Sequence, residues 1–135
     1  MDLQKSMMIS AAGLKAQTTR MRIIAENMAN ADSIASVPGG DPYRRKTVTF
    51  KNVLDREIDV RKVEVGKVKV DRSELDKEYD PAHPGADDKG YVKQSNVNTL
   101  IEAMDMREAQ RSYEGNLSVI EASRRMMMDT IDLLK

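Results

Sequence analysis

The sequence predicts a mainly α-helical chain in which a small β insert separates two long terminal helices paired as a coiled coil. Near both ends, apolar residues recur at alternating spacings of four and three. In the middle, short valine-rich stretches alternate between apolar and polar residues, beside clusters of glycine and proline. We therefore expect residues 1–33 and 94–135 to form the paired helices, and residues 34–93 to form a loop and the β insert.

Composition excludes several classes of function. Lysine plus arginine and aspartate plus glutamate number 22 each, so no long-range field favours nucleic acid, an acidic membrane surface or a charged substrate. One phenylalanine, four tyrosines and no tryptophan are few for a ligand pocket or a base-stacking platform. The chain has no cysteine, which excludes disulfides, thiolate zinc sites and a cysteine nucleophile. Ten methionines favour adaptable packing between helices.

The first long helix is predicted to begin at Leu3 and to end near residues 30 to 33. Its apolar seam passes through Leu3, Met7, Leu14, Met21, Ile24, Met28 and Ala31. Ser10 and Gln17 interrupt this seam and Gly13 lies beside it, so we expect a partner to order the helix. Asn30, which tolerates the left-handed conformation, and the breaker cluster at residues 38–42 predict where the helix stops.

Short β-strands are predicted between the helices. Residues 46–50 alternate as a half-buried strand does, and the alternation returns in the pairs Ile58/Val60, Val63/Val65 and Val68/Val70. Gly66 is a candidate turn that would join the last two pairs as a hairpin. Residues 79–91 are rich in proline, glycine and aspartate, which predicts a loop of successive turns.

A second long helix is predicted after Asn96 and runs almost to the C-terminus. Its stripe begins with Val97, Leu100, Ile101 and Met104. The stripe then changes phase, and its members alternate at spacings of four and three residues. Its single charged member is Arg124, and the others are Tyr113, Leu117, Ile120, Met127, Ile131 and Leu134. This heptad pattern predicts pairing with the first helix. The consecutive residues Met126–Met128 face different directions around a helix, which favours packing against further neighbours.

No group of residues predicts catalysis or a bound cofactor. His83, the only histidine, lies between two prolines, where we expect a solvated loop residue. Asp80, Asp87 and Asp88 lack the acid spacing of a calcium loop and are expected to form turns. The basic run Arg44-Arg45-Lys46 is expected to be a solvated turn entering a strand, the alternative being contact with phosphate or an acidic partner. We therefore expect a non-enzymatic protein with no cofactor and no metal site.

Two sets of segments resemble the signatures of the bacterial flagellar rod and hook axial protein family. The first set is Asn27–Ser33 and Pro42–Lys46, with residues 34–41 intervening as they do in proximal rod members. The second set comprises Tyr79–Pro84, Gly90–Lys93, Asn96–Asn98, Arg111–Glu114 and Asn116. Together they cover both helices and the loop before the second, whereas residues 51–78 carry little resemblance. Gly115 stands where the family more often has alanine, and we expect it to admit a close helix contact.

The resemblance implies a structural subunit of the proximal rod of the flagellar basal body, which polymerises through its terminal helices and transmits motor torque across the periplasm. It implies export by the flagellar type III apparatus without a cleaved signal peptide. The implied partners are copies of the chain, other rod proteins and basal-body proteins near the rings and export gate, with no nucleic acid, small-molecule substrate or membrane span. The expected assembly interface comprises Leu3, Met7, Leu14, Met21, Ile24, Asn27, Met28, Asn30, Tyr43, Arg44, Tyr113, Asn116, Leu117, Ile120, Met127, Ile131 and Leu134.

Two other functions remain open from the residues alone. A coiled-coil adaptor would bridge two soluble proteins through the β insert, and should form a stable helical dimer when free. An enzyme acting on the cell wall would need a carboxylate pair, for which only the three loop aspartates are candidates. For the rod subunit, aspartate in place of Met21 or Ile24 is expected to block assembly and leave the protein soluble, because a charge would face the partner helix.

Overall fold

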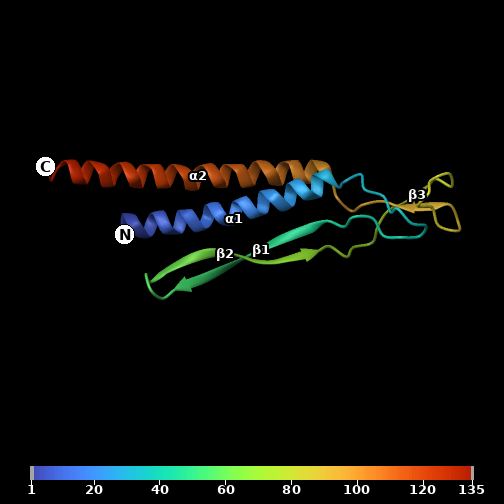
Figure 1. The fold of residues 1–135 in the computed structure, drawn as a ribbon, viewed down its shortest axis with the longest axis horizontal. Helices are drawn as coiled ribbons and strands as arrows, with labels where there is room; N and C mark the ends of the chain where they lie inside the picture. The colour runs from blue at the N-terminus through green and yellow to red at the C-terminus, as the bar shows by residue number, and fades with distance from the viewer. Residues whose placement is uncertain (1, 135) are drawn as a thin grey trace. The chain divides into compact units, whose positions relative to one another are not determined.

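The computed structural model describes residues 2–134, which form two long helices and two two-stranded β-sheets (Figure 1). In chain order the elements are α1 (Leu3–Ala29), β1 (Lys46–Asp55), β2 (Val60–Val70), β3 (Lys77–Tyr79), β4 (Tyr91–Lys93) and α2 (Thr99–Asp132). The predicted fold class is confirmed, because the two long helices lie at the ends of the chain and all strands lie between them.

Contacts between residues divide the chain into two compact units. The first unit contains the residues up to Met21, Val48–Lys67 and the residues from Arg107 onward. The second unit contains Arg22–Thr47 and Val68–Met106. As a result, each of the elements α1, α2, β1 and β2 has one end in the first unit and the other end in the second unit.

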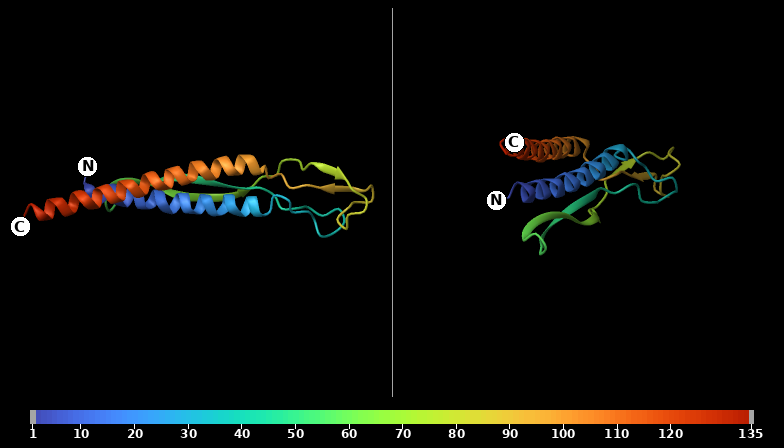
Figure 2. Two further views of the ribbon diagram at one scale, coloured as in Figure 1. Left: turned by 90° about the horizontal axis from the view of Figure 1, so that it is seen from above. Right: turned by 60° about the vertical axis from the view of Figure 1, so that its left-hand side comes forward.

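In the first unit, α1 lies between α2 and the hairpin of β1 and β2 (Figures 1 and 2). The two helices run antiparallel. Arg20 on α1 forms an ion pair with Glu108 on α2, with 3.1 Å between guanidinium nitrogen and carboxylate oxygen. Closer to the N-terminus of α1, a Cβ added to Gly13 would lie 2.8 Å from the side chain of Asn116 on α2. The absence of a side chain at Gly13 therefore lets α2 approach closely.

Polar side chains in the second unit end α1 and begin α2. Asn98 caps α2, because its Oδ1 accepts the N–H of Leu100 at 3.0 Å and that of Ile101 at 3.3 Å. α1 ends at Ala29, next to the predicted boundary. Asn30 does not adopt the left-handed conformation that was expected to stop the helix, since Asp59 is the only non-glycine residue with positive φ among residues 2–134. Instead the carbonyl of Glu26 accepts both the Asn30 side-chain amide at 2.8 Å and the Asn30 backbone N–H at 3.2 Å.

The hairpin turn lies at residues 56–59, and the prediction of a turn at Gly66 is wrong. Asp59 takes a left-handed φ of 48°, and Asp55 Oδ1 accepts the N–H of Glu57 at 3.1 Å. β2 runs through Gly66, where an added Cβ would lie 2.7 Å from Oγ1 and 3.0 Å from the carbonyl oxygen of Thr49 on β1. Gly66 therefore permits a close approach of the two strands, which are longer than the short strands expected, at 10 and 11 residues.

Replacing Gly66 by alanine should lower the free energy of unfolding by about 1–3 kcal/mol, because the added methyl group overlaps with β1. Gly115→Ala is the matched control on α2: within the described chain, nothing outside its own helix backbone lies within 4 Å of a Cβ built there. That change should raise the free energy of unfolding by about 0.5–1 kcal/mol. Urea unfolding followed by circular dichroism measures both, and equal stability of the two variants would contradict the close approach at Gly66.

The second unit holds a small sheet that the sequence pattern misses. β3 and β4 pair antiparallel with Tyr79 opposite Tyr91, and the two rings meet edge to face at 5.3 Å between centroids. The loop between them makes the turns predicted for its aspartates: Asp87 Oδ1 accepts the N–H of Tyr91 at 2.9 Å, which lowers the pKa of the Asp87 carboxyl. His83 also stabilises a turn rather than being merely solvated, because its Nδ1 accepts the N–H of Gly85 at 3.0 Å.

The apolar core is small. The fully buried hydrophobic residues among those described are Ala16, Ile23, Ile24, Ala35, Val92 and Ala109. The largest fully buried side chains are instead polar, namely Asn27 and Glu102, each 1% exposed. In the part of the chain that the structure describes, neither helix has an apolar stretch long enough to span a membrane. Much of the apolar surface of the two helices therefore stays on the outside of the folded chain.

Candidate functional site

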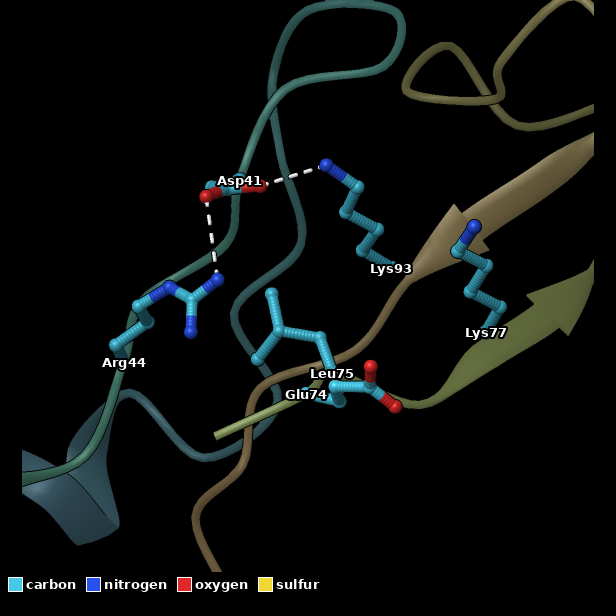
Figure 3. A pocket seen from close by; sticks show the side chains of 6 residues that line it. All are labelled: Asp41, Arg44, Glu74, Leu75, Lys77 and Lys93. Atoms are coloured by element: carbon cyan, nitrogen blue, oxygen red, sulfur yellow. Dashed lines mark hydrogen bonds and ion pairs between the residues drawn. The ribbon is translucent and has the colours of Figure 1, made fainter. Parts of the chain in front are cut away.

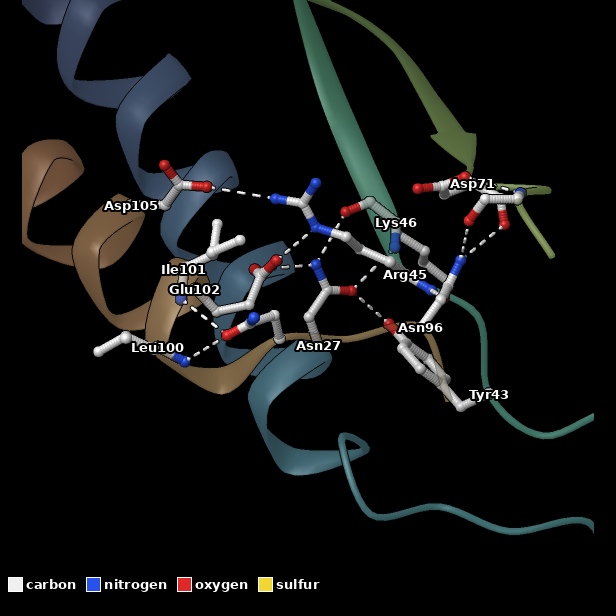
Figure 4. A network of polar contacts seen from close by, with 12 residues as sticks. Asn27, Tyr43, Arg45, Lys46, Asp71, Asn96, Leu100, Ile101, Glu102 and Asp105 are labelled. Carbon is white, nitrogen blue, oxygen red and sulfur yellow. Dashed lines mark hydrogen bonds and ion pairs between the residues drawn. The ribbon is translucent and has the colours of Figure 1, made fainter. Parts of the chain in front are cut away.

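Asn27, in the last turn of α1, lies at the centre of a buried polar cluster in the second unit (Figure 4). Its side-chain amide donates to the carbonyl of Lys46 at 2.8 Å and to Glu102 Oε2 at 3.0 Å. Its Oδ1 accepts the Tyr43 hydroxyl at 2.8 Å and the N–H of Lys46 at 2.9 Å. All four bonds of an asparagine amide are thus made, which is what a buried amide needs in order not to destabilise the fold.

Glu102, in the first turn of α2, brings a buried carboxylate to the same cluster (Figure 4). Arg45 Nε donates to Glu102 Oε1 at 2.5 Å, and another guanidinium nitrogen of Arg45 lies 3.3 Å from Asp105. The backbone N–H of Arg45 donates to Asn96 Oδ1 at 2.7 Å. A buried carboxylate is tolerable only with such partners, so the cluster ties the start of β1 to the C-terminal end of α1 and to the N-terminal end of α2.

Each residue of the basic run 44–46 forms an ion pair inside the chain. Arg45 pairs with Glu102, and Lys46 pairs with Glu26. This hydrogen bond to Glu26 is the main cause that raises the pKa of Lys46. The run enters a strand as predicted, since Lys46 begins β1, but its cations are not merely solvated. Acids on the two helices neutralise Arg45 and Lys46, and Asp41 pairs with Arg44.

Arg44 belongs to a separate polar group around Asp41 (Figure 3). Asp41 accepts from Lys93 Nζ at 2.7 Å and from an Arg44 guanidinium nitrogen at 3.3 Å. Lys93 first and then Arg44 lower the pKa of the Asp41 carboxyl. With Leu75, Glu74 and other side chains they line a shallow cavity of about 270 Å³. The ion pair between Asp41 and Lys93 joins the loop at Asp41 to β4.

The stripe that α1 buries in its own chain only partly follows the predicted apolar seam. Its most buried members include Ser10, Gly13 and Ala16 in the first unit. Of the α1 residues expected at the assembly interface, Ile24 and Asn27 are buried and Met28 is exposed, whereas the others are half-buried: Leu3, Met7, Leu14, Met21 and, just after the helix, Asn30. Tyr43 and Arg44 are half-buried as well. Small residues therefore make the close helix contact, and larger ones flank it.

On α2 the heptad spacing holds, but only half of the buried stripe is the one predicted. Tyr113, Ile120 and Met127 are half-buried, as that stripe requires, whereas Leu117, Ile131 and Leu134 are exposed. The other half of the stripe consists of the fully buried Glu102, Ala109 and Ser123, together with the half-buried Asn116, which was expected at the assembly interface. The prediction of a close helix contact at Gly115 is wrong within this chain, because nothing outside its own helix backbone lies within 4 Å of a Cβ built there. The close contact between the helices occurs at Gly13 instead. Short side chains let the two helices approach closely. The spacing of large apolar residues alone therefore does not identify the half of the α2 stripe that lies deepest in the helix contact.

Two apolar surfaces on α2 remain exposed. The outer apolar cluster, in the second unit, consists of Leu100, Ile101 and Met104, with Leu100 70% and Met104 65% exposed. The α2 tail, residues 126–134 in the first unit, exposes Met126, Met128, Ile131, Leu133 and Leu134. Such concentrations of exposed large apolar side chains mark protein–protein contacts. The arrangement can therefore hold a chain rigid at the Asn27 cluster and bind neighbours along α2.

The sequence predicted Asn27 and Tyr43 as residues of an assembly interface, and it did not predict that they lie in one cluster with Arg45 and Glu102. Glu102 carried a usable signal, because it lies seven residues before Ala109 and so continues the heptad of that residue and later ones. A carboxylate on a buried stripe requires a cation, and the run at 44–46 was the available source.

Comparisons with known proteins agree with an assembly role. Residues 88–133 match the family described as flagellar basal body rod FlgEFG protein C-terminal. The chain is 53% identical over 127 residues to the flagellar basal-body rod protein FlgC of Agrobacterium fabrum, covering 94% of this chain and 91% of the relative. It is 36% identical over 131 residues to the protein of that name from Salmonella typhimurium, covering 93% and 92%. The protein of that name from Borreliella burgdorferi is 36% identical over 153 aligned positions, covering 100% and 99%.

Proposed function

We propose that this chain, which belongs to the FlgC family of flagellar basal-body rod proteins, polymerises through its terminal helices into the rod and there transmits motor torque across the periplasm. The family is one of structural rod components and not of known enzymes. The partners that we propose are copies of the chain, other rod proteins and basal-body proteins next to the rings and the export gate.

The observation that carries this proposal is the distribution of apolar side chains on α2. Its buried stripe is filled by small and polar residues such as Ala109 and Ser123, whereas Leu100, Met104 and Leu133 are exposed. Burial of apolar surface drives association, so a chain that keeps its large apolar residues outside gains most of its stability from neighbours. A monomeric protein would use these residues in its own core.

Torque transmission requires a subunit that does not bend at its joints. Paired helices resist bending through many small packing contacts, and the Asn27 cluster ties the ends of both helices to the first residue of β1. Export by the flagellar type III apparatus requires that the free chain unfold readily. A core of few, mostly small side chains supports this part of the proposal, because little apolar area opposes unfolding.

The proposal is tested by replacing the cell's own copy with an epitope-tagged copy of this chain and purifying basal bodies. We expect motile cells and the tagged chain in the rod fraction. Addition of a protease from the periplasmic side should leave the assembled chain intact, and a secretion-deficient strain should retain it in the cytoplasm. Motile cells whose purified basal bodies lack the chain would overturn the proposal.

A further inference from the structure

We propose that the α2 tail of a second copy of this chain docks into a cavity between α1 and the hairpin in the first unit. This hairpin cavity has a volume of about 530 Å³ and is lined by Ile9, Gly13, Gln17, Phe50, Arg61 and Val63, among others. The inference rests on the proposed function, because it names another subunit as the occupant. It adds which surface of one copy meets which surface of the next.

The walls and the rim of the hairpin cavity differ in character. Ile9, Phe50 and Val63 give it apolar walls, and Asn116 of α2, which packs against Gly13, also lines it. Arg61 and Lys51, which are exposed and both line the cavity, make the rim basic. The cavity therefore fits an apolar segment that carries negative charge.

The α2 tail has this chemistry. Leu133 and Leu134 are 87% and 83% exposed, and Met128 and Ile131 are more than half exposed. Between residues 126 and 134 the chain has neither lysine nor arginine, and the exposed Asp129 carries a negative charge. The last turn of α2 contains no basic residue, so the negative end of the helix dipole is uncompensated there. An apolar and acidic helix end thus matches an apolar cavity with a basic rim.

The tail that fills the cavity must come from another copy. Gly13 of the cavity lies opposite Asn116 on α2 of its own chain. Leu133 comes 17 residues after Asn116 in the sequence, which places it about 25 Å further along the helix at a rise of ~1.5 Å per residue. Figure 2 shows the C-terminal end of α2 extending beyond the N-terminal end of α1. A continuous helix cannot fold back over that distance to fill its own cavity.

The contact joins two different surfaces, because the tail of one copy meets the cavity of the next. Such a contact leaves an unused tail at one end of a pair and an unused cavity at the other. Repetition therefore produces a ring or an open filament rather than a closed dimer. An open filament is the arrangement that a rod requires.

Cross-linking between two single-cysteine variants tests the contact, since the chain has no cysteine of its own. Leu133→Cys marks the tail, and Asn52→Cys marks the rim of the cavity, which Asn52 also lines. Both variants are produced in the same cells and treated with a short bismaleimide, so that a mixed dimer reports contact between copies. Gln110→Cys, at an exposed position on α2, is the matched control for Leu133→Cys. We expect mixed dimers with Leu133→Cys and none with Gln110→Cys.

A charge reversal sharpens the test. Arg61→Asp should reduce the yield of mixed dimers by about tenfold, and Asp129→Arg in the copy that supplies the tail should restore it. Circular dichroism of each purified variant verifies that it folds. If the variants assemble into basal bodies but no mixed dimer forms, or if the Gln110→Cys control cross-links as efficiently, the docking inference is overturned and the proposed function stands. If the chain is missing from basal bodies of motile cells, the proposed function itself fails.

Discussion

Replacing Asn27 by aspartate should lower the free energy of unfolding by about 3–5 kcal/mol at neutral pH. The change removes no volume, but it replaces two N–H donors by an oxygen. That oxygen would face Glu102 Oε2 at 3.0 Å and the carbonyl of Lys46 at 2.8 Å, where hydrogen bonds now form. Glu102 is almost fully buried, so solvent cannot screen the two carboxylates from one another. Urea unfolding monitored by circular dichroism measures the loss.

Asn98→Asp is the matched control for this prediction. Asn98 acts only as an acceptor for the N–H groups of Leu100 and Ile101, and aspartate caps a helix about as well as asparagine. The same chemical change should therefore alter the free energy of unfolding by less than about 0.5 kcal/mol. Comparable losses at positions 27 and 98 would contradict the donor role assigned to Asn27.

The pH dependence of Asn27→Asp follows from the same geometry. A carboxyl beside the Glu102 carboxylate favours its protonated form in the folded state, so its folded pKa lies above its unfolded pKa. The destabilisation is then greatest above the folded pKa and shrinks as the pH falls through it, because one proton shared by the pair restores a donor. As the pH is lowered from neutral to ~4, the free energy of unfolding of the variant should approach that of the unchanged chain.

The ends of the fold follow from the sequence more closely than its middle. Both helices are long enough for apolar spacing to outweigh isolated breakers such as Gly13, so their existence and approximate limits are predictable. The hairpin turn at residues 56–59 contains neither glycine nor proline, and its left-handed residue is Asp59. Gly66 carried the stronger turn signal, yet it serves the close packing of two strands. Local turn preference cannot distinguish these two uses of glycine.

The Asn27 cluster lies beyond what a single sequence predicts, because it depends on residues brought together from three distant segments. Asn27 and Glu102 are 75 residues apart in the chain, and both are polar, so hydrophobic patterning assigns them to the surface. The helix pairing was predictable, but its buried half on α2 at Ala109 and Ser123 was not. Small side chains give a weak periodic signal although they permit the closest approach of two backbones.

Replacing Met104 by aspartate should abolish assembly, and with it motility, while leaving the stability of the free chain nearly unchanged. Met104 is 65% exposed, so a charge there costs the monomer little. A neighbour that covers the outer apolar cluster would have to bury that charge without a partner, which is strongly unfavourable. Ile24→Asp is a less informative variant, because Ile24 is only 5% exposed and the charge would disrupt the chain's own fold.

Gln110→Asp is the control for Met104→Asp, because it introduces the same side chain at another exposed position of α2, outside the outer apolar cluster. Swimming in soft agar and the amount of chain in purified basal bodies report assembly, and urea unfolding of the purified variants reports the fold. We expect the Met104 variant to fold, to be absent from basal bodies and to leave cells non-motile, whereas the Gln110 variant swims. Swimming cells that carry Met104→Asp in intact rods would mean that the outer apolar cluster faces solvent in the assembled rod, and that the α2 tail and other surfaces supply the contacts.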